Sequence, residues 1–384
     1  MATTFDKPSL QQRIVASLQT YDGPLLLAAL ILSIIGLITM YSVGADHGAR
    51  FVGHARNLLI AAVVMFAVAQ IPPQRMMALA IPMYTIGVAL LFAVEFFGIE
   101  RKGSQRWLNI GVVIQPSEIM KVALPLMMAW WFQRREGQIR ALDYVVAAGL
   151  LMVPWALIFI QPDLGTSLLV LASGLFVLFF AGLSWKLIIP PVLMGLVGVT
   201  LLIVMEDPWC APGVDWVVLK DYQRIRVCTL LDPFQDPLGK GFHIIQGMIA
   251  IGSGGAWGKG YMQGTQTHLE FIPERTTDFI FAAFSEEFGL IGFLALAVAF
   301  VFLIVRALTI ALEGPTLFAR LLAGAMALNI FVYVFVNMGM VSGILPVVGV
   351  PLPFVSYGGT AMVTMGLGLG ILLSVAKSKR LMQS

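Results

Sequence analysis

The sequence predicts an all-α polytopic membrane protein with ten transmembrane helices and one large extracytoplasmic loop. Hydrophobic residues make up 59% of its 384 positions and charged residues only 12%, a balance too apolar for a soluble chain of this length. Apolar runs near the length needed to cross a bilayer recur along the whole chain. We therefore expect a single membrane domain over residues 1–384.

Ten apolar runs are interpreted as transmembrane spans. They cover about 24–43, 57–71, 77–97, 116–133, 143–160, 164–182, 187–205, 279–305, 318–341 and 359–376. The second run is short and the fourth begins with charged residues, so their ends are the least defined. The first run is too long for a removable signal peptide and has no small-residue cleavage site.

Basic residues in the short loops set the expected orientation, because they are enriched on the cytoplasmic side of membrane proteins. With both termini inside, twelve lysines and arginines lie in the cytoplasm and five in the short outer loops. The cytoplasm then holds residues 1–23 and the tail 377–384, and the membrane region covers 24–376. The long loop of about 206–277 is extracytoplasmic in this orientation.

The only two cysteines, Cys210 and Cys228, both lie in the extracytoplasmic loop. In an oxidising compartment we expect them to form a disulfide with a structural role. Two reduced thiols in an irregular segment are the alternative.

Two further segments of this loop have recognisable patterns. The apolar spacing of residues 243–251 predicts a short amphipathic helix on the membrane surface. The glycine-rich segment 252–260 is not a nucleotide-binding P-loop, since Ser253 and Gly260 occupy positions that require other residues. Its amides and Lys259 could still cradle a pyrophosphate, although a flexible turn is the simpler interpretation.

The apolar segment 344–354 contains three prolines and cannot form a regular helix. Irregular backbone is tolerated at membrane depth only where protein or a cavity surrounds it. We therefore expect a re-entrant or packed outer loop between the last two spans.

Asp278 is the first candidate for chemistry, since it ends the polar loop and begins an apolar helix at the outer headgroup level. Beside Arg275, its carboxylate could act as a general base on a sugar hydroxyl. The alternative is an N-cap, because an aspartate before a helix satisfies free backbone amides. Further along the helix, Glu286 and Glu287 are interpreted as structural capping or pairing groups rather than as catalysts.

The second candidate is the pair Glu118 and Lys121, which lie three residues apart inside the fourth span. Such a pair lowers the cost of burying each charge, and either a functional site or a structural bridge explains it. Lys121 could also reach a phosphate.

Three more charged positions complete the candidates. Asp163 follows a proline at a helix start, which favours an N-cap. Arg106 belongs to an outer basic cluster with Arg101 and Lys102 that suits an anionic partner. Arg224 is of the same kind, with solvated loop charge as its alternative. The sequence contains neither the ligand spacing of a metal site nor the basic stripe of a nucleic-acid-binding protein.

Together these motifs resemble the SEDS family (shape, elongation, division and sporulation) over nearly the whole chain. The matching segments include Gly103–Leu108, Gln115–Glu118, Gln161–Ser167, Asp221–Arg224, His243–Gln246, Pro273–Phe279 and Gly343–Gly359. The resemblance implies a peptidoglycan glycosyltransferase that polymerises lipid II at the outer face of the bacterial plasma membrane. Ten transmembrane helices, with a GT-C-like fold as one arrangement, are also implied, together with a class B penicillin-binding protein as transpeptidase partner in cell elongation.

The resemblance also assigns roles to residues. The essential acidic residue of the family falls on Asp278, and its important Glu and Lys fall on Glu118 and Lys121. The implied reaction is an inverting transfer that releases undecaprenyl pyrophosphate, with Lys121, Arg106, Arg224 and Arg275 as unranked cations for the leaving group. The sequence leaves open whether a divalent cation (Mg²⁺ or Mn²⁺) bridges Asp278 and the pyrophosphate.

Two other functions compete with the enzyme. A lipid II flippase would also have broken helices and buried charge, but its charges should follow a path through the membrane midplane. A scaffold that only activates the transpeptidase would leave Asp278 without a role. The segment 207–218, which carries Cys210, is interpreted as an insertion relative to the family.

Overall fold

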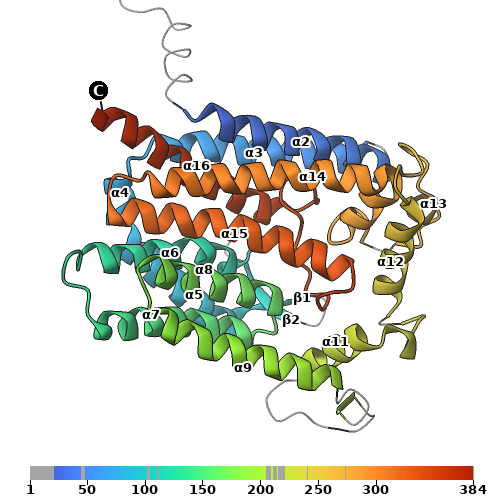
Figure 1. Ribbon diagram of the computed structural model, residues 1–384, viewed down its shortest axis with the longest axis horizontal. Coiled ribbons are helices and arrows are strands. Elements are labelled where there is room, and N and C mark those ends of the chain that lie inside the picture. The colour runs from blue at the N-terminus through green and yellow to red at the C-terminus, as the bar shows by residue number, and fades with distance from the viewer. Residues whose placement is uncertain are drawn as a thin grey trace, which may run out of the picture.

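The computed structural model of the chain is a bundle of long helices with a smaller part, formed by the segment between α9 and α14, at one end (Figure 1). It describes residues 21–44, 48–101, 104–109, 111, 113–204, 209–210, 214, 221–239, 241–272 and 274–383. Most of the expected cytoplasmic segment 1–23, most of the expected insertion 207–218, and Lys102 lie outside the described residues.

Each of the ten expected spans coincides with one long helix. These helices are α2 (Gly23–Val43), α3 (Ala49–Ala69), α5 (Ala80–Phe97), α6 (Pro116–Gln133), α7 (Ala141–Ile160), α8 (Leu164–Phe180), α9 (Trp185–Val204), α14 (Ile280–Leu312), α15 (Leu317–Val341) and α16 (Gly359–Gln383). Within the described chain, eight of them are long and apolar enough to cross a membrane. The other two are α8, which has 17 residues, and α6, which carries the charged pair Glu118 and Lys121.

Shorter elements lie between the spans. They are α4 (Pro73–Ala78), α11 (Asp221–Leu231), the 3₁₀ helix η1 (Pro233–Gln235), α12 (Phe242–Gly254) and α13 (Thr265–His268). A three-stranded antiparallel sheet of β1 (Ile99–Arg101), β2 (Ser104–Asn109) and β3 (Val113–Ile114) forms the outer loop before α6. Helix α12 confirms the expected short helix at 243–251, whereas the sheet was not expected.

Two helices extend beyond their expected ends because distant partners compensate their polar residues. Helix α3 begins at Ala49 rather than near 57, and His54 in its added turns contacts the Phe354 carbonyl at 3.1 Å. Helix α14 continues past 305, since Arg306 is held by Asp22 at the N-cap of α2, with Nε 2.9 Å from Oδ1. Local composition gives no sign of either partner.

Helix α15 forms the centre of the bundle. It packs against α14, α8, α6 and α16, and lies between the layer of α2, α3 and α14 and the layer of α5 to α8 (Figure 1). Helix α9 is the opposite case, since none of its residues is buried. The bundle therefore has one helix enclosed by protein and one that presents every side to its surroundings.

Helix α14 is broken at Gly289, whose φ of 62° and ψ of −161° are not helical. The amides of Leu290 and Ile291 that the break frees donate to the carbonyls of Gly255 and Ala256, at 2.9 and 3.1 Å. A Cβ at Gly289 would lie 2.3 Å from the amide nitrogen of Gly258, so only glycine fits there. The glycine-rich segment 252–260 is therefore packed into the break, which corrects both its interpretation as a flexible turn and the idea of freely exposed amides.

The 344–358 segment, which joins α15 to α16, contains no helix, as its prolines predict. Its residues Val350, Leu352, Phe354 and Val355 are buried. It reaches as far as α2, where a Cβ at Gly36 would lie 2.2 Å from the Phe354 carbonyl oxygen. We call this segment the 344–358 loop, and it is a packed part of the structure.

Candidate active site around the 344–358 loop

Asp278 lies in the turn before α14 and is half-buried. The helix begins at Ile280 with Phe279 as its N-cap, so Asp278 is not the capping residue. Its carboxylate faces the 344–358 loop, because a Cβ placed on Gly349 would lie 3.3 Å from Asp278 Oδ2.

Backbone contacts hold the Asp278 turn against the loop. The buried Asn337 of α15 donates through Nδ2 to the carbonyls of Asp278 and Val350, at 2.9 and 2.7 Å. The amide of Tyr357 donates to the Thr276 carbonyl at 2.8 Å. These three hydrogen bonds join the turn, the loop and the central helix into one unit.

The guanidinium of Arg275 points away from this unit. It donates to the Val43 carbonyl at 3.2 Å and to Glu270 Oε1 at 2.9 Å. Arg275 therefore ties the end of α2 to the segment that contains Glu270. Arg226 of α11 reaches the 344–358 loop instead, where it donates to the Val347 carbonyl at 2.9 Å.

Asp163 and Arg106 lie on the other side of the same loop. Asp163 is the N-cap of α8, as the sequence predicts, and accepts from the Thr166 amide at 3.2 Å and from Gln115 Nε2 at 2.8 Å. Arg106 of β2 is 3.3 Å from Asp163 Oδ1 and keeps 27% of its side chain exposed. At the same helix start, a Cβ on Gly165 would lie 2.7 Å from the Val348 carbonyl oxygen.

Glu118 and Lys121 form the expected pair, with Lys121 Nζ 2.5 Å from Glu118 Oε1. Two other helices complete it: Tyr333 of α15 contacts Lys121 Nζ at 2.6 Å, and Thr364 of α16 donates to Glu118 Oε2 at 3.0 Å. Lys121 is 4% exposed. The cluster therefore bonds α6 to α15 and α16, and Tyr333 also lines a small cavity beneath the 344–358 loop.

Lys259 and Glu286 form a separate, structural group. Glu286 is fully buried and accepts from Lys259 Nζ at 2.6 Å and from the Gln266 amide at 2.8 Å. It also accepts from the amide and hydroxyl of Thr267, at 3.2 and 2.9 Å. Lys259 is therefore bound within the protein, and its ammonium fixes the 252–260 segment to the broken helix.

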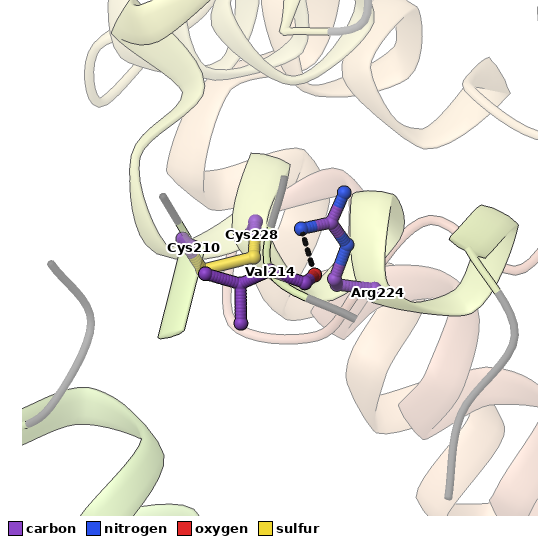
Figure 2. Close-up of a disulfide and its surroundings, with 4 residues drawn as sticks. All are labelled: Cys210, Val214, Arg224 and Cys228. Atoms are coloured by element: carbon purple, nitrogen blue, oxygen red, sulfur yellow. Dashed lines mark hydrogen bonds between the residues drawn. A yellow bond between two sulfur atoms is a disulfide. The ribbon is translucent and has the colours of Figure 1, made fainter. Parts of the chain in front are cut away.

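Cys210 and Cys228 are joined in a disulfide, the pairing that the sequence favours. Figure 2 shows Arg224 beside it, with its guanidinium donating to the Val214 carbonyl at 2.5 Å. The disulfide and Arg224 line a cavity together with Asp232, Gln235 and Asp236. Arg224 thus binds the segment between the cysteines.

The sequence did not point to two residues that the structure brings to this site, namely Asn337 and Gly349. Asparagine within the apolar run of α15, present at Asn329 and Asn337, is the one signal that could have been used. Among the described residues, no three His, Cys, Asp or Glu side chains lie close enough to hold a metal ion. A divalent cation at Asp278 would therefore take most of its ligands from a phosphate-bearing substrate and water.

Comparison with known proteins identifies the family. The model for cell cycle proteins of the FtsW, RodA and SpoVE group matches residues 24–381. The chain belongs to this family. It is the SEDS family to which the sequence motifs point.

SEDS relatives are similar over almost their full length. Peptidoglycan glycosyltransferase MrdB of Escherichia coli K12 is 46% identical over 362 residues, which cover 94% of this chain and 95% of MrdB. Stage V sporulation protein E of Bacillus subtilis 168 is 34% identical over 373 residues, covering 94% and 98%.

Solved structures of SEDS proteins share the fold. A chain of a peptidoglycan synthase complex that coordinates polymerization and crosslinking superposes with a TM-score of 0.76 at 32% identity, covering 94% of this chain and 98% of that one. The rod shape determining protein RodA of Thermus thermophilus superposes with a TM-score of 0.68 at 26% identity, covering 94% and 97%. This chain is thus a multi-pass helical membrane protein of the SEDS type.

Proposed function

We propose that this protein is a peptidoglycan glycosyltransferase that polymerises lipid II into β-1,4 glycan strands at the outer face of the plasma membrane. The observation that carries the proposal is the half-buried Asp278 carboxylate, held by Asn337 against the 344–358 loop at the extracytoplasmic end of the bundle. The 46% identity to a protein named peptidoglycan glycosyltransferase supports the reaction class.

In the proposed reaction Asp278 is the general base. Its carboxylate takes the proton from the 4-hydroxyl of the acceptor's terminal GlcNAc, and that oxygen forms a bond to the anomeric carbon of the donor MurNAc. The bond between this carbon and the pyrophosphate oxygen breaks, and undecaprenyl pyrophosphate leaves with the electron pair. Attack from the opposite face converts an α-linked donor into a β-linked product.

The leaving pyrophosphate needs positive charge, and we rank the candidates by their exposure and contacts. Arg106 comes first in this proposal, because its side chain is partly exposed and pairs with Asp163 at the helix start where Gly165 meets Val348 of the 344–358 loop. Lys121 is buried and hydrogen-bonded to Glu118 and Tyr333, so its proposed role is to stabilise the helices that carry the site. The remaining cations are bound in other parts of the protein: Arg224 binds Val214, Arg275 binds Glu270, and Lys259 binds Glu286.

The cellular setting is part of the proposal. We assign the protein to the bacterial plasma (inner) membrane, with both termini in the cytoplasm and the loop 206–277 outside. A class B penicillin-binding protein is the proposed transpeptidase partner during cell elongation, supported by the similarity to a chain of a peptidoglycan synthase complex. Lipid II and the undecaprenyl-pyrophosphate-linked glycan are the proposed substrates.

The test is lipid II polymerisation by the purified protein with its transpeptidase partner, comparing wild type with Asp278→Ala. Glycan strands from the wild type alone are the expected result. Equal polymerisation by both proteins contradicts the assignment of Asp278 as the base. If neither intact complex polymerises lipid II, the flippase and scaffold functions replace the enzyme.

A further inference from the structure

The strongest link between the core and the candidate base is a single side chain. Asn337 is 0% exposed in the middle of the protein, yet its Nδ2 donates to two carbonyls that belong to separate segments. One acceptor is the backbone of Asp278 itself, and the other is Val350, the neighbour of Gly349. The amide therefore fixes the base and the loop opposite it from one point.

The two anchored segments meet at the Asp278 carboxylate. Gly349 has a φ of 73°, and a Cβ there would lie 3.3 Å from Asp278 Oδ2. The left-handed conformation suits glycine, and the missing side chain leaves room for the carboxylate. The backbone of the 344–358 loop at Gly349 therefore lies close to the Asp278 carboxylate.

We propose that Asn337 is a positioning residue for the glycosyl transfer, and that it sets the place of Asp278 by fixing its backbone to the 344–358 loop. This inference rests on the proposed role of Asp278 as the base. Asn337 does not touch substrate, and it acts through the geometry of the carboxylate. Misplacing a reacting group by about 1 Å can lower a rate on the order of 100-fold.

The chain contains a matched control for Asn337. Asn329 lies on the same helix and is also buried, at 7% exposure, but its Nδ2 donates to Ser173 Oγ at 3.2 Å. In both residues the side-chain oxygen has no partner within the described part of the chain. Asn337→Leu and Asn329→Leu therefore remove similar groups from one helix, and only the first touches the Asp278 turn.

A second pair of variants tests the loop side without altering the core. Gly349→Ala places a methyl group against the Asp278 carboxylate. Gly343→Ala imposes the same backbone strain, at a φ of 74°, but its methyl group meets the flexible Met248 side chain. This pair tests the positioning role even if Asn337→Leu does not fold.

The experiment measures turnover and KM for lipid II in the complex with the transpeptidase, together with the thermal unfolding of each variant. We expect Asn337→Leu and Gly349→Ala to lower turnover by roughly 10- to 100-fold while KM stays within about twofold. Asn329→Leu and Gly343→Ala should keep wild-type turnover per folded molecule. A purely structural role would make Asn337→Leu behave as Asn329→Leu does.

Asp278→Ala in the same assay separates the two proposals. If Asp278→Ala is inactive while Asn337→Leu and Gly349→Ala match their controls, the positioning role is overturned and the base assignment stands. If Asp278→Ala polymerises lipid II as the wild type does, the base assignment fails and the positioning role fails with it.

Discussion

Two carboxylates eight residues apart, Asp278 and Glu286, have opposite surroundings. The Glu286 side chain is fully buried and accepts from an ammonium, two hydroxyls and two amides. Asp278 is half-buried, its backbone carbonyl accepts from Asn337, and its carboxylate faces Gly349 of the 344–358 loop. Glu286 is thus enclosed by donors from its own neighbourhood, whereas Asp278 lies where the turn before α14 meets the 344–358 loop. The difference shows why acidic residues in one short segment should have separate functions.

The largest effect should come from exchanging Asp278 for its neutral isostere. Asp278→Asn removes the base while keeping the backbone contact with Asn337, so we expect polymerisation to fall by about 10² to 10⁴. The unfolding temperature should stay close to that of the wild type. If Asp278→Asn lost stability as well as activity, Asp278 would be a structural residue as Glu286 is, and the prediction would be wrong.

Glu286 should show the reverse pattern. Glu286→Ala removes the carboxylate that accepts from Lys259 and from two backbone amides, and we expect a loss of about 3 kcal/mol in the free energy of unfolding. Thermal unfolding in detergent measures it. The double variant Glu286→Ala with Lys259→Met should be less destabilised than the sum of the single variants. If the losses of the two single variants added up in the double variant, a direct interaction between Glu286 and Lys259 would be contradicted.

Arg106 should act on binding rather than on the base. Arg106→Ala removes a charged donor beside the 344–358 loop and leaves the N-cap bonds of Asp163 to Thr166 and Gln115. We expect about a tenfold increase in KM for lipid II, consistent with a charged hydrogen bond of about 1.5 kcal/mol. Arg320→Ala, at an exposed site at the start of α15, is the control. Equal KM values for Arg106→Ala and Arg320→Ala would show that Arg106 does not contribute to binding lipid II.

The smallest effect should come from the disulfide, which lies apart from Asp278. Replacing Cys210 and Cys228 by serine should change turnover by less than about twofold, since Arg226, rather than Cys228, makes the hydrogen bond from α11 to the 344–358 loop. Intact mass before and after reduction tests the bond itself. Two thiols that alkylate without a reductant would show that the bridge is absent.

The sequence predicted the spans because apolar runs of bilayer length do not depend on distant partners. It also predicted the Glu118–Lys121 pair and the Asp163 cap, which follow from spacing along one helix. It did not predict the roles of Asn337 and Gly349, which depend on where the 344–358 loop packs. Lys259 was placed among phosphate ligands because its partner, Glu286, lies 27 residues away in sequence. Local patterns give elements and caps, whereas the site depends on contacts between segments that are remote in sequence.

Helix α9 responds to the bilayer in a way that α15 does not. With no buried residue, α9 is held in its tilt by less protein packing than α15 is. Its 20 residues span about 30 Å, close to the hydrocarbon thickness of an average membrane. A thinner membrane should tilt it and a thicker one should bring it upright, so hydrophobic mismatch would change one flank of the protein while the enclosed α15 keeps its place.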